Sequence, residues 1–150
     1  MNEHVSNGVC ATCPPGTTND AGDDVSGQDT SCDPVLCSEN EYVSNNTCVA
    51  CAAGTTNDAG DDASGVDTMC DVTLCNANER VLNNTCVACA AGTTNAASDD
   101  ASGSDTICDV TYCLANERVS NNLCVACAAG MTNAAGDNAS GSDTTCDVTY

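Results

Sequence analysis

The sequence lacks the large apolar side chains from which most domains build a core. Its 150 residues include no Phe, no Trp and three tyrosines, and the hydrophobic fraction of 41% comes mainly from Ala, Val and Cys. These small side chains bury little apolar area, whereas ordering the chain costs roughly 1.5 kcal/mol per residue. We therefore expect no sizeable core, and covalent cross-links must supply the missing stability.

Positive charge is equally scarce. Two Lys and Arg residues face 22 Asp and Glu residues, which gives a formal net charge of -20. A surface this acidic repels nucleic-acid phosphates and anionic lipid, and no apolar run reaches a membrane-spanning length. We expect no nucleic-acid partner and no direct membrane insertion.

Catalytic groups are also missing from the sequence pattern. His4 is the single histidine, and no part of the chain repeats a His or Lys base beside a nucleophile. The sequence therefore predicts that the protein is not an enzyme, with no catalytic residue and no cofactor.

Cysteine, by contrast, is abundant. The 15 cysteines make up a tenth of the chain, a density typical of secreted disulfide scaffolds. This predicts an extracellular or cell-surface location. Residues 1–30 contain no secretion signal, so we expect the chain to be an excerpt of a longer protein.

The cysteines recur with a strict period of 38 residues. Three of the four series are Cys10, Cys48, Cys86 and Cys124; Cys13, Cys51, Cys89 and Cys127; and Cys32, Cys70, Cys108 and Cys146. The fourth is Cys37, Cys75 and Cys113. This divides the chain into a truncated repeat 1 (1–36), repeat 2 (37–74), repeat 3 (75–112) and repeat 4 (113–150), with the period continuing beyond both ends. Strict repetition predicts units stacked head to tail as a rod or filament, through self-association or further repeats.

Each repeat has two halves. The first reads C-x-x-N-E-x-V-x-N-N-x-C, as from Cys37 to Cys48, and the asparagine pair favours a tight hairpin turn. The second half is rich in Gly, Asp, Asn, Ser and Thr, which favour loops. The predicted fold class is therefore small disulfide-rich repeats of short β-hairpins and loops with almost no helix.

Four cysteines per repeat allow three pairings within the unit, and the sequence does not decide among them. We prefer first-to-second and third-to-fourth pairing, in which each bridge stabilises by about 3 kcal/mol. The resulting pairs are Cys13–Cys32, Cys37–Cys48, Cys51–Cys70, Cys75–Cys86, Cys89–Cys108, Cys113–Cys124 and Cys127–Cys146, and Cys10 pairs with a cysteine preceding residue 1.

Polar segments carry candidate modification sites. N-x-S/T sequons predict N-glycosylation at Asn45, Asn83 and Asn138. The adjacent threonines are candidate O-glycosylation sites, with pairing in short strands as the alternative. These threonines are Thr17, Thr18, Thr55, Thr56, Thr93 and Thr94.

The order of hairpin, C-x-x-C, Gly-Thr, acidic loop and Asp-Thr-x-Cys resembles two groups of proteins. One is the cysteine-rich modules of tumour necrosis factor receptors and ephrin-receptor-like repeats, which have six cysteines where this repeat has four. The other, which the long identical C-x-x-C-x-x-G-T-T repeats resemble more closely, is the surface antigens and coat proteins of ciliates and other microbial eukaryotes. The resemblance implies a secreted or membrane-tethered ectodomain.

Two metal alternatives remain open. The C-x2-C-x18-C-x4-C spacing is close to that of zinc ribbons, but those usually end in a second C-x2-C pair, and we favour disulfides. The acidic loop, as at Asp61, Asp62 and Asp67, offers oxygen ligands for calcium, although it lacks an EF-hand spacing; solvated turn acids are the alternative. A redox C-x-x-C is disfavoured because no cation or helix terminus would lower a thiol pKa.

The leading functional hypothesis is a structural extracellular repeat protein that forms a glycosylated filament, surface coat or surface antigen. A receptor-type cysteine-rich binding module and a calcium-dependent adhesive rod are the alternatives. The sameness of the repeats argues against a specific binding site, since such a site usually departs locally from the consensus.

Overall fold

The structure is a computed structural model that describes residues 2–148. Within this range it contains 16 short strands and no helix, paired as eight two-stranded antiparallel sheets. The prediction of a small disulfide-rich fold of hairpins and loops is therefore confirmed. The chain divides into two compact units, Met1–Val72 and Thr73–Tyr150, which are described separately.

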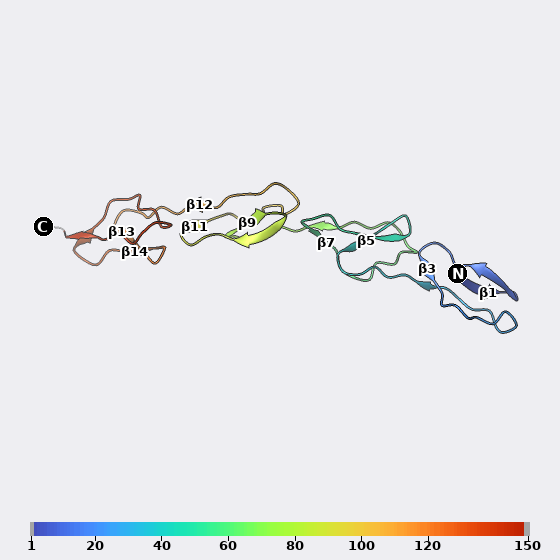
Figure 1. The fold of residues 1–150 in the computed structure, drawn as a ribbon. Helices are drawn as coiled ribbons and strands as arrows, with labels where there is room; N and C mark the ends of the chain where they lie inside the picture. Colours follow the sequence, from blue (N-terminus) through green and yellow to red (C-terminus); the bar gives the residue numbers. More distant parts are fainter. Residues whose placement is uncertain (1, 149–150) are drawn as a thin grey trace. The chain divides into compact units, whose positions relative to one another are not determined.

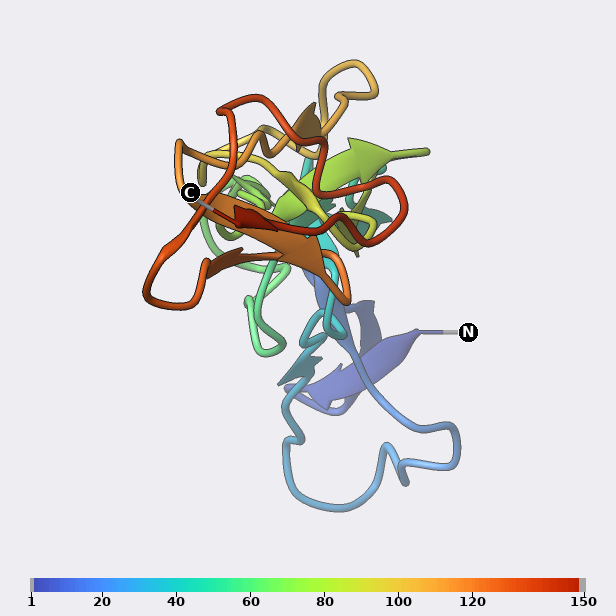
Figure 2. The ribbon, with the colours of Figure 1, turned by 90° about the vertical axis from the view of Figure 1, so that its left-hand side faces the viewer.

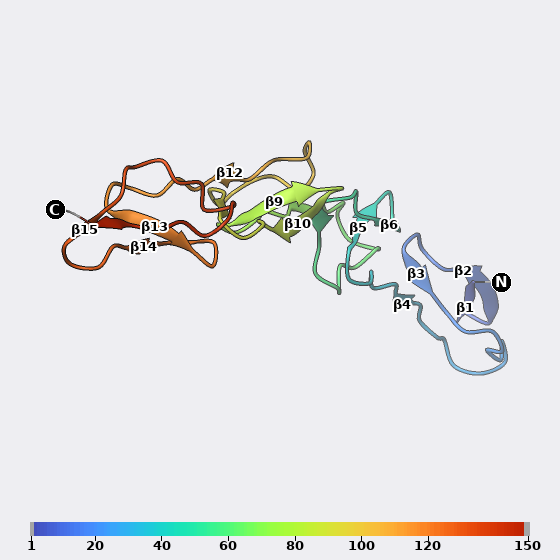
Figure 3. The ribbon, with the colours of Figure 1, turned by 60° about the vertical axis from the view of Figure 1, so that its left-hand side comes forward.

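The first half of each repeat contains a β-hairpin whose two strands have four residues each. Unit 1 contains β1 (Glu3–Ser6) with β2 (Val9–Thr12) and β5 (Glu41–Ser44) with β6 (Thr47–Ala50). Unit 2 contains β9 (Glu79–Leu82) with β10 (Thr85–Ala88) and β13 (Glu117–Ser120) with β14 (Leu123–Ala126). Figure 1 labels several of these strands, and Figure 3 shows β13 and β14 as one hairpin near the C-terminal end.

The hairpin turns follow from the asparagine pairs. Asn45 and Asn46 both have positive φ, 49° and 57°, and Ser44 pairs with Thr47 across a two-residue loop. Two left-handed residues in a two-residue loop make a type I′ turn, whose twist matches that of the strands. In repeat 1 the turn is Asn7-Gly8, with φ values of 50° and 74°. The predicted hairpin therefore lies where the asparagines place it.

A shorter strand pair closes the second half of each repeat. These pairs are β3 (Thr17–Thr18) with β4 (Asp33–Pro34), β7 (Thr55–Thr56) with β8 (Asp71–Val72), β11 (Thr93–Thr94) with β12 (Asp109–Val110), and β15 (Met131–Thr132) with β16 (Asp147–Val148). The paired threonines thus lie in strands, which the sequence left as an alternative. Between the two strands the chain is a loop; in repeat 1 it is the wide light-blue arc in Figure 2.

The structure joins the cysteines in the preferred first-to-second and third-to-fourth pairing. Bridges separated by 11 residues are Cys37–Cys48, Cys75–Cys86 and Cys113–Cys124. Bridges separated by 19 residues are Cys13–Cys32, Cys51–Cys70, Cys89–Cys108 and Cys127–Cys146. The first kind anchors the hairpin, and the second kind closes the loop.

The core of each repeat is a single valine with its neighbours. Val43 is fully buried and faces Cys48 in the hairpin register. In unit 2, Val81 packs with Cys75 and Ala101, and Cys86 covers the cluster. A cluster this small buries little area, so the disulfides carry a large share of the stability.

Consecutive repeats meet through backbone in both units. In unit 1 the end of repeat 1 pairs with the loop of repeat 2, where the Ala63 N–H donates to the Val35 carbonyl at 2.9 Å. Gly16 lies so close that a Cβ on it would come within 2.2 Å of the Ala63 carbonyl oxygen. Ala63 is 1% exposed, whereas Val25 at the same position of repeat 1 is 45% exposed.

The junction between repeats 3 and 4 in unit 2 has the same construction. The Ala139 N–H donates to the Thr111 carbonyl at 2.9 Å, and a Cβ on Gly92 would lie 2.3 Å from the carbonyl carbon of Ala139. Both junctions therefore use a glycine that has no room for a side chain.

Candidate functional site

The acidic loop is organised around one aspartate that joins it to the hairpin. Oδ2 of Asp61 accepts hydrogen bonds from Thr68 Oγ1 and from Asn57 Nδ2. Thr68 Oγ1 also accepts from the Val43 N–H at 2.9 Å, and Asn57 Nδ2 also donates to the Glu41 carbonyl at 2.8 Å. Two side chains thus link the carboxylate to Glu41 and Val43 of strand β5.

All four repeats contain this network. The equivalent aspartates are Asp23, Asp61, Asp99 and Asp137; the threonines are Thr30, Thr68, Thr106 and Thr144; and the asparagines are Asn19, Asn57, Asn95 and Asn133. Sequence reasoning noted the acidic loop at Asp61, Asp62 and Asp67 but missed the asparagines and threonines that bind the aspartates of this network. Their own recurrence every 38 residues was the available signal.

Two further acidic positions also have structural partners. Oδ1 of Asp67 accepts the N–H of Asn45 at the hairpin turn, 3.0 Å away. Oδ1 of Asp62 accepts both the N–H and the hydroxyl of Ser64, at 2.8 Å and 2.6 Å, which is an Asx turn. The hydrogen bonds of the acidic loop therefore account for Asp61, Asp62 and Asp67 as structural acids, and calcium binding stays a prediction.

These hydrogen bonds stabilise the ionised carboxylates. The bond from Thr68, followed by that from Asn57, holds the pKa of Asp61 below its ordinary value. The side-chain and backbone donors of Ser64 likewise lower the pKa of Asp62. Asp61 and Asp62 are therefore ionised at neutral pH while they accept these hydrogen bonds.

The hairpin tips carry two of the three sequons. Asn45 and Asn83 are exposed first residues of type I′ turns. The second asparagine of each turn has a different task, because Asn46 Nδ2 donates to the buried Ala63 carbonyl at 2.9 Å. The turn therefore places one asparagine toward the loop and leaves its neighbour accessible.

The third sequon lies in the loop of repeat 4. Asn138 is exposed and occupies the Asx-turn position of Asp62. All three predicted N-glycosylation sites thus lie on the surface, which a sugar requires, and their occupancy stays a prediction.

The two threonines of each pair differ in hydrogen bonding and exposure. The hydroxyls of Thr17, Thr55 and Thr93 donate to the carbonyl three residues earlier, at 2.8–2.9 Å. Thr18, Thr56 and Thr94 are exposed. Any O-linked sugar is therefore more easily placed on the second threonine of a pair.

The cysteines do not offer the zinc ligands considered from the sequence. Among residues 2–148, 14 cysteines are in disulfides and Cys10 is unpaired and exposed. A tetrahedral zinc site needs thiolates, which a disulfide does not provide. The predicted partner of Cys10 precedes residue 1 and lies outside the described residues.

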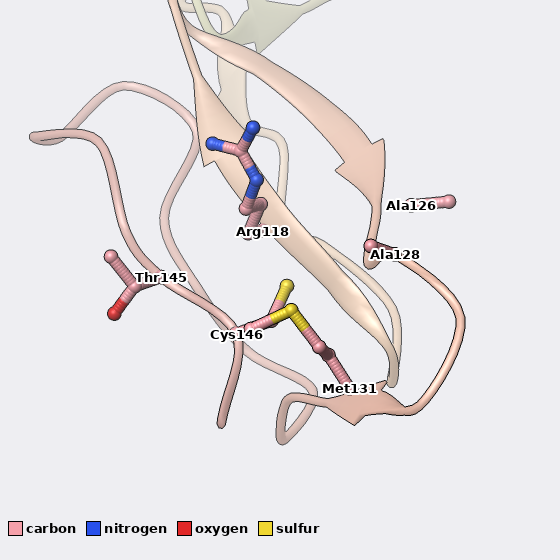
Figure 4. Close-up of a pocket in the computed structure, with 6 residues that line it drawn as sticks. All are labelled: Arg118, Ala126, Ala128, Met131, Thr145 and Cys146. Carbon is pink, nitrogen blue, oxygen red and sulfur yellow. The ribbon is translucent and has the colours of Figure 1, made fainter. Parts of the chain in front are cut away.

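A shallow surface hollow recurs at one position of the repeat. In repeat 4 its volume is about 530 Å³, and Figure 4 shows Arg118 and Met131 on either side of the hollow with Cys146 between them. Related hollows occur beside Tyr42 in repeat 2 and Arg80 in repeat 3. The hollow has apolar alanine and disulfide surface with one polar or cationic side chain at its edge, and the sequence analysis did not identify it.

Comparisons with known proteins leave the family open. No protein-family model, no curated protein and no solved structure matches the chain. Residues 2–148 include no helix of the length and hydrophobicity that would cross a membrane. The resemblances to surface antigens and receptor modules stay predictions.

Proposed function

We propose that this chain is part of a structural extracellular protein that builds a glycosylated filament, surface coat or surface antigen by repetition of one disulfide-closed unit. The observation that carries the proposal is the repeated junction. Gly16 packs against Ala63 in unit 1 as Gly92 packs against Ala139 in unit 2. A Cβ added to Gly16 would lie 2.2 Å from the Ala63 carbonyl oxygen, and one added to Gly92 would lie 2.3 Å from the Ala139 carbonyl oxygen. A junction that recurs unchanged is what an extendable array needs.

The chemistry of the junction supports extension because it relies on backbone. The Ala63 N–H donates to the Val35 carbonyl and the Ala139 N–H donates to the Thr111 carbonyl, each at 2.9 Å. Glycine and backbone groups are present in every repeat, so one repeat can follow another without a special partner sequence. In repeats 2, 3 and 4 the hairpin and the loop are each closed by their own disulfide and do not need a large shared core.

The surface supports an extracellular role in the same way. Disulfides persist in oxidising compartments, and a net charge of -20 keeps a long assembly soluble and discourages lateral clumping. Sugars on the exposed hairpin tips would shield the same surface from proteases.

The test uses arrays of increasing length. The chain and variants with one, two and four additional copies of residues 75–112, inserted in register, are secreted from eukaryotic cells and measured by small-angle X-ray scattering. We expect the maximum dimension to increase by an equal step per added repeat, because the junction in unit 1 and the junction of repeats 3 and 4 in unit 2 have the same construction. Intact mass should show sugar and a gain of about 2 Da per bridge on reduction.

Other results would reject the proposal. A maximum dimension that grows as the square root of repeat number would describe a flexible chain rather than a structural array. A sugar-free protein with reduced thiols would contradict the extracellular location.

A further inference from the structure

The sequon in repeat 4 has a local geometry that the other two lack. Oδ1 of Asn138 accepts the Ser140 N–H at 2.8 Å and the Ser140 hydroxyl at 2.6 Å. Within residues 2–148, Nδ2 of Asn138, which is the atom that would carry a sugar, makes no hydrogen bond, and the residue is exposed. The Asx turn thus fixes the side chain through its oxygen and leaves its nitrogen accessible.

An exposed aromatic ring lies beside this asparagine across the junction. Tyr112 and Asn138 form an antiparallel bridge, flanked by hydrogen bonds from Ala139 N–H to Thr111 and from Cys113 N–H to Asp137. Bonds on both flanks identify Tyr112 and Asn138 as a non-hydrogen-bonded pair, the type in which facing side chains come closest, with Cα atoms about 4.5 Å apart. The Tyr112 side chain is 61% exposed.

The two residues change together along the chain. The equivalent bridges pair Leu36 with Asp62 and Leu74 with Asp100. In the junction of repeats 3 and 4, the leucine becomes Tyr112 and the aspartate becomes Asn138. The only bridge that contains a glycosylatable asparagine, among those of residues 2–148, is thus the one that contains an aromatic ring.

We propose that the ring of Tyr112 is a platform on which the first sugar of an N-glycan at Asn138 packs, so that the glycan strengthens the junction between repeats 3 and 4. This inference rests on the proposed glycosylated extracellular function. A pyranose has an apolar face of C–H groups, and an exposed tyrosine offers a flat apolar surface with a polar hydroxyl at its edge. The packing covers ring area that is exposed in the unmodified protein.

The modification itself is the ordinary sequon reaction. Nδ2 of Asn138 forms a bond to the anomeric carbon of a glycosyl diphosphate donor, the bond from that carbon to the diphosphate oxygen breaks, and the diphosphate leaves with the displaced Nδ2 proton. The cell's glycosyltransferase supplies the donor and the catalysis. Ser140, the hydroxyl residue that the sequon requires, lies with its Oγ 2.6 Å from Oδ1 of Asn138.

The chain supplies its own control substitutions. Asn138→Asp removes the sequon but keeps the Asx turn, because Asp62 and Asp100 form the same turn with Ser64 and Ser102. Tyr112→Leu restores the residue found at positions 36 and 74. Thr47→Val and Thr85→Val silence the other two sequons with the residue that repeat 1 has at position 9.

The experiment compares four secreted proteins in the Thr47→Val, Thr85→Val background: the parent, Asn138→Asp, Tyr112→Leu and the double variant. We expect the parent to melt about 3 °C or more above Asn138→Asp, and this difference to shrink to less than half in the Tyr112→Leu pair. Nuclear Overhauser effects between the Tyr112 ring and the first N-acetylglucosamine provide the direct readout. They should be present in the parent.

Two outcomes would overturn the inference. One is a glycosylated Asn138 without these Overhauser effects and with equal melting differences in both pairs. The other is an unmodified Asn138 in the unsubstituted chain, secreted alongside, when Asn45 and Asn83 of that chain carry sugar. Both leave the proposed extracellular function intact. Secretion with no sugar at any sequon would count against the glycosylated function itself.

Discussion

At the scale of single residues, Thr68 is the point at which the loop and the hairpin meet. Its hydroxyl accepts the N–H of the fully buried Val43 and donates to Asp61, and its own N–H donates to the Val43 carbonyl at 3.0 Å. The loop therefore completes the hydrogen bonding of a strand residue that would otherwise have no partner on that side. This explains why threonine recurs two residues before the last cysteine of each repeat.

Thr68→Val should destabilise the protein by about 1–3 kcal/mol, because valine has nearly the same shape but leaves the buried Val43 N–H without an acceptor. Chemical denaturation with the disulfides intact measures the change in unfolding free energy. The matched control is Thr56→Val at an exposed strand position, where we expect a change within about 0.5 kcal/mol. Equal effects of the two substitutions would refute the assigned role of Thr68.

At the scale of elements, the repeat consists of a hairpin and a loop, and three links fix the loop in place. The disulfide closes the loop, Thr68 joins it to the strand, and Asn46 joins its buried alanine to the hairpin turn. The same loop forms the junction with the preceding repeat through the Ala63 N–H. One segment thus completes its own repeat and connects it to a neighbour.

Gly92→Ala and Gly130→Ala separate the junction from backbone strain. Both glycines are left-handed, with φ values of 77° and 82°, so each substitution should cost about 1–2 kcal/mol for strain. A Cβ on Gly92 meets Ala139 at 2.3 Å, whereas a Cβ on Gly130 has nothing within 4 Å in the described structure. We expect Gly92→Ala to cost about 1–3 kcal/mol more.

The measurement is again the unfolding free energy, together with hydrogen exchange at the Ala139 N–H. Exchange there should be faster in Gly92→Ala than in Gly130→Ala. If both variants lose the same stability and protect this amide equally, the close approach at Gly92 does not contribute to the junction.

At the scale of the whole molecule, disulfides and hydrogen bonds to carboxylates compensate for the small hydrophobic core. The chain carries a net charge of -20, yet many of its carboxylates are hydrogen-bonded acceptors within the loops. The pKa values of Asp23, Asp24, Asp61, Asp62, Asp99 and Asp137 are all lowered, mainly by bonds from threonine or serine hydroxyls. Ionisation of these groups is therefore coupled to folding.

Acid should weaken the fold through these carboxylates. Because their pKa values are lower in the folded than in the unfolded state, the unfolded state binds more protons in acid. The stabilisation is complete above the ordinary value of 3.8 and is lost as the pH falls through the lowered folded pKa. Unfolding free energies measured between about pH 2 and pH 6 at fixed ionic strength should therefore fall as the pH is lowered below 3.8.

Acid also reduces the repulsion among the many carboxylates of the chain. The substitution Asp61→Asn separates the contribution of this one carboxylate from that general effect. The amide oxygen can still accept from Thr68 and Asn57, but it does not titrate in this range. The variant should show a shallower pH dependence than the parent. Parallel pH profiles would mean that Asp61 is not coupled to folding.

The sequence by itself determined the repeat, the hairpins and the absence of a conventional core. A period of 38 residues is visible in the cysteines, and asparagine pairs such as Asn45-Asn46 indicate the type I′ turn because few other residues tolerate two left-handed conformations. The preferred cysteine pairing also came from the sequence, although three pairings were open there. The structure forms that pairing because the hairpin brings Cys48 back to Cys37 and the loop brings Cys70 back to Cys51.

Only the tertiary structure decided what the acids, the glycines and Tyr112 do. Asp61 and Asp67 look alike in the sequence, yet one binds Thr68 and Asn57 and the other caps the hairpin turn at Asn45. The partners of Asp61 are 4 and 7 positions away and the partner of Asp67 is 22 positions away, and composition and spacing do not specify which donor meets which acceptor. The pairing of Tyr112 with Asn138 likewise exists only because one repeat ends against the loop of the next.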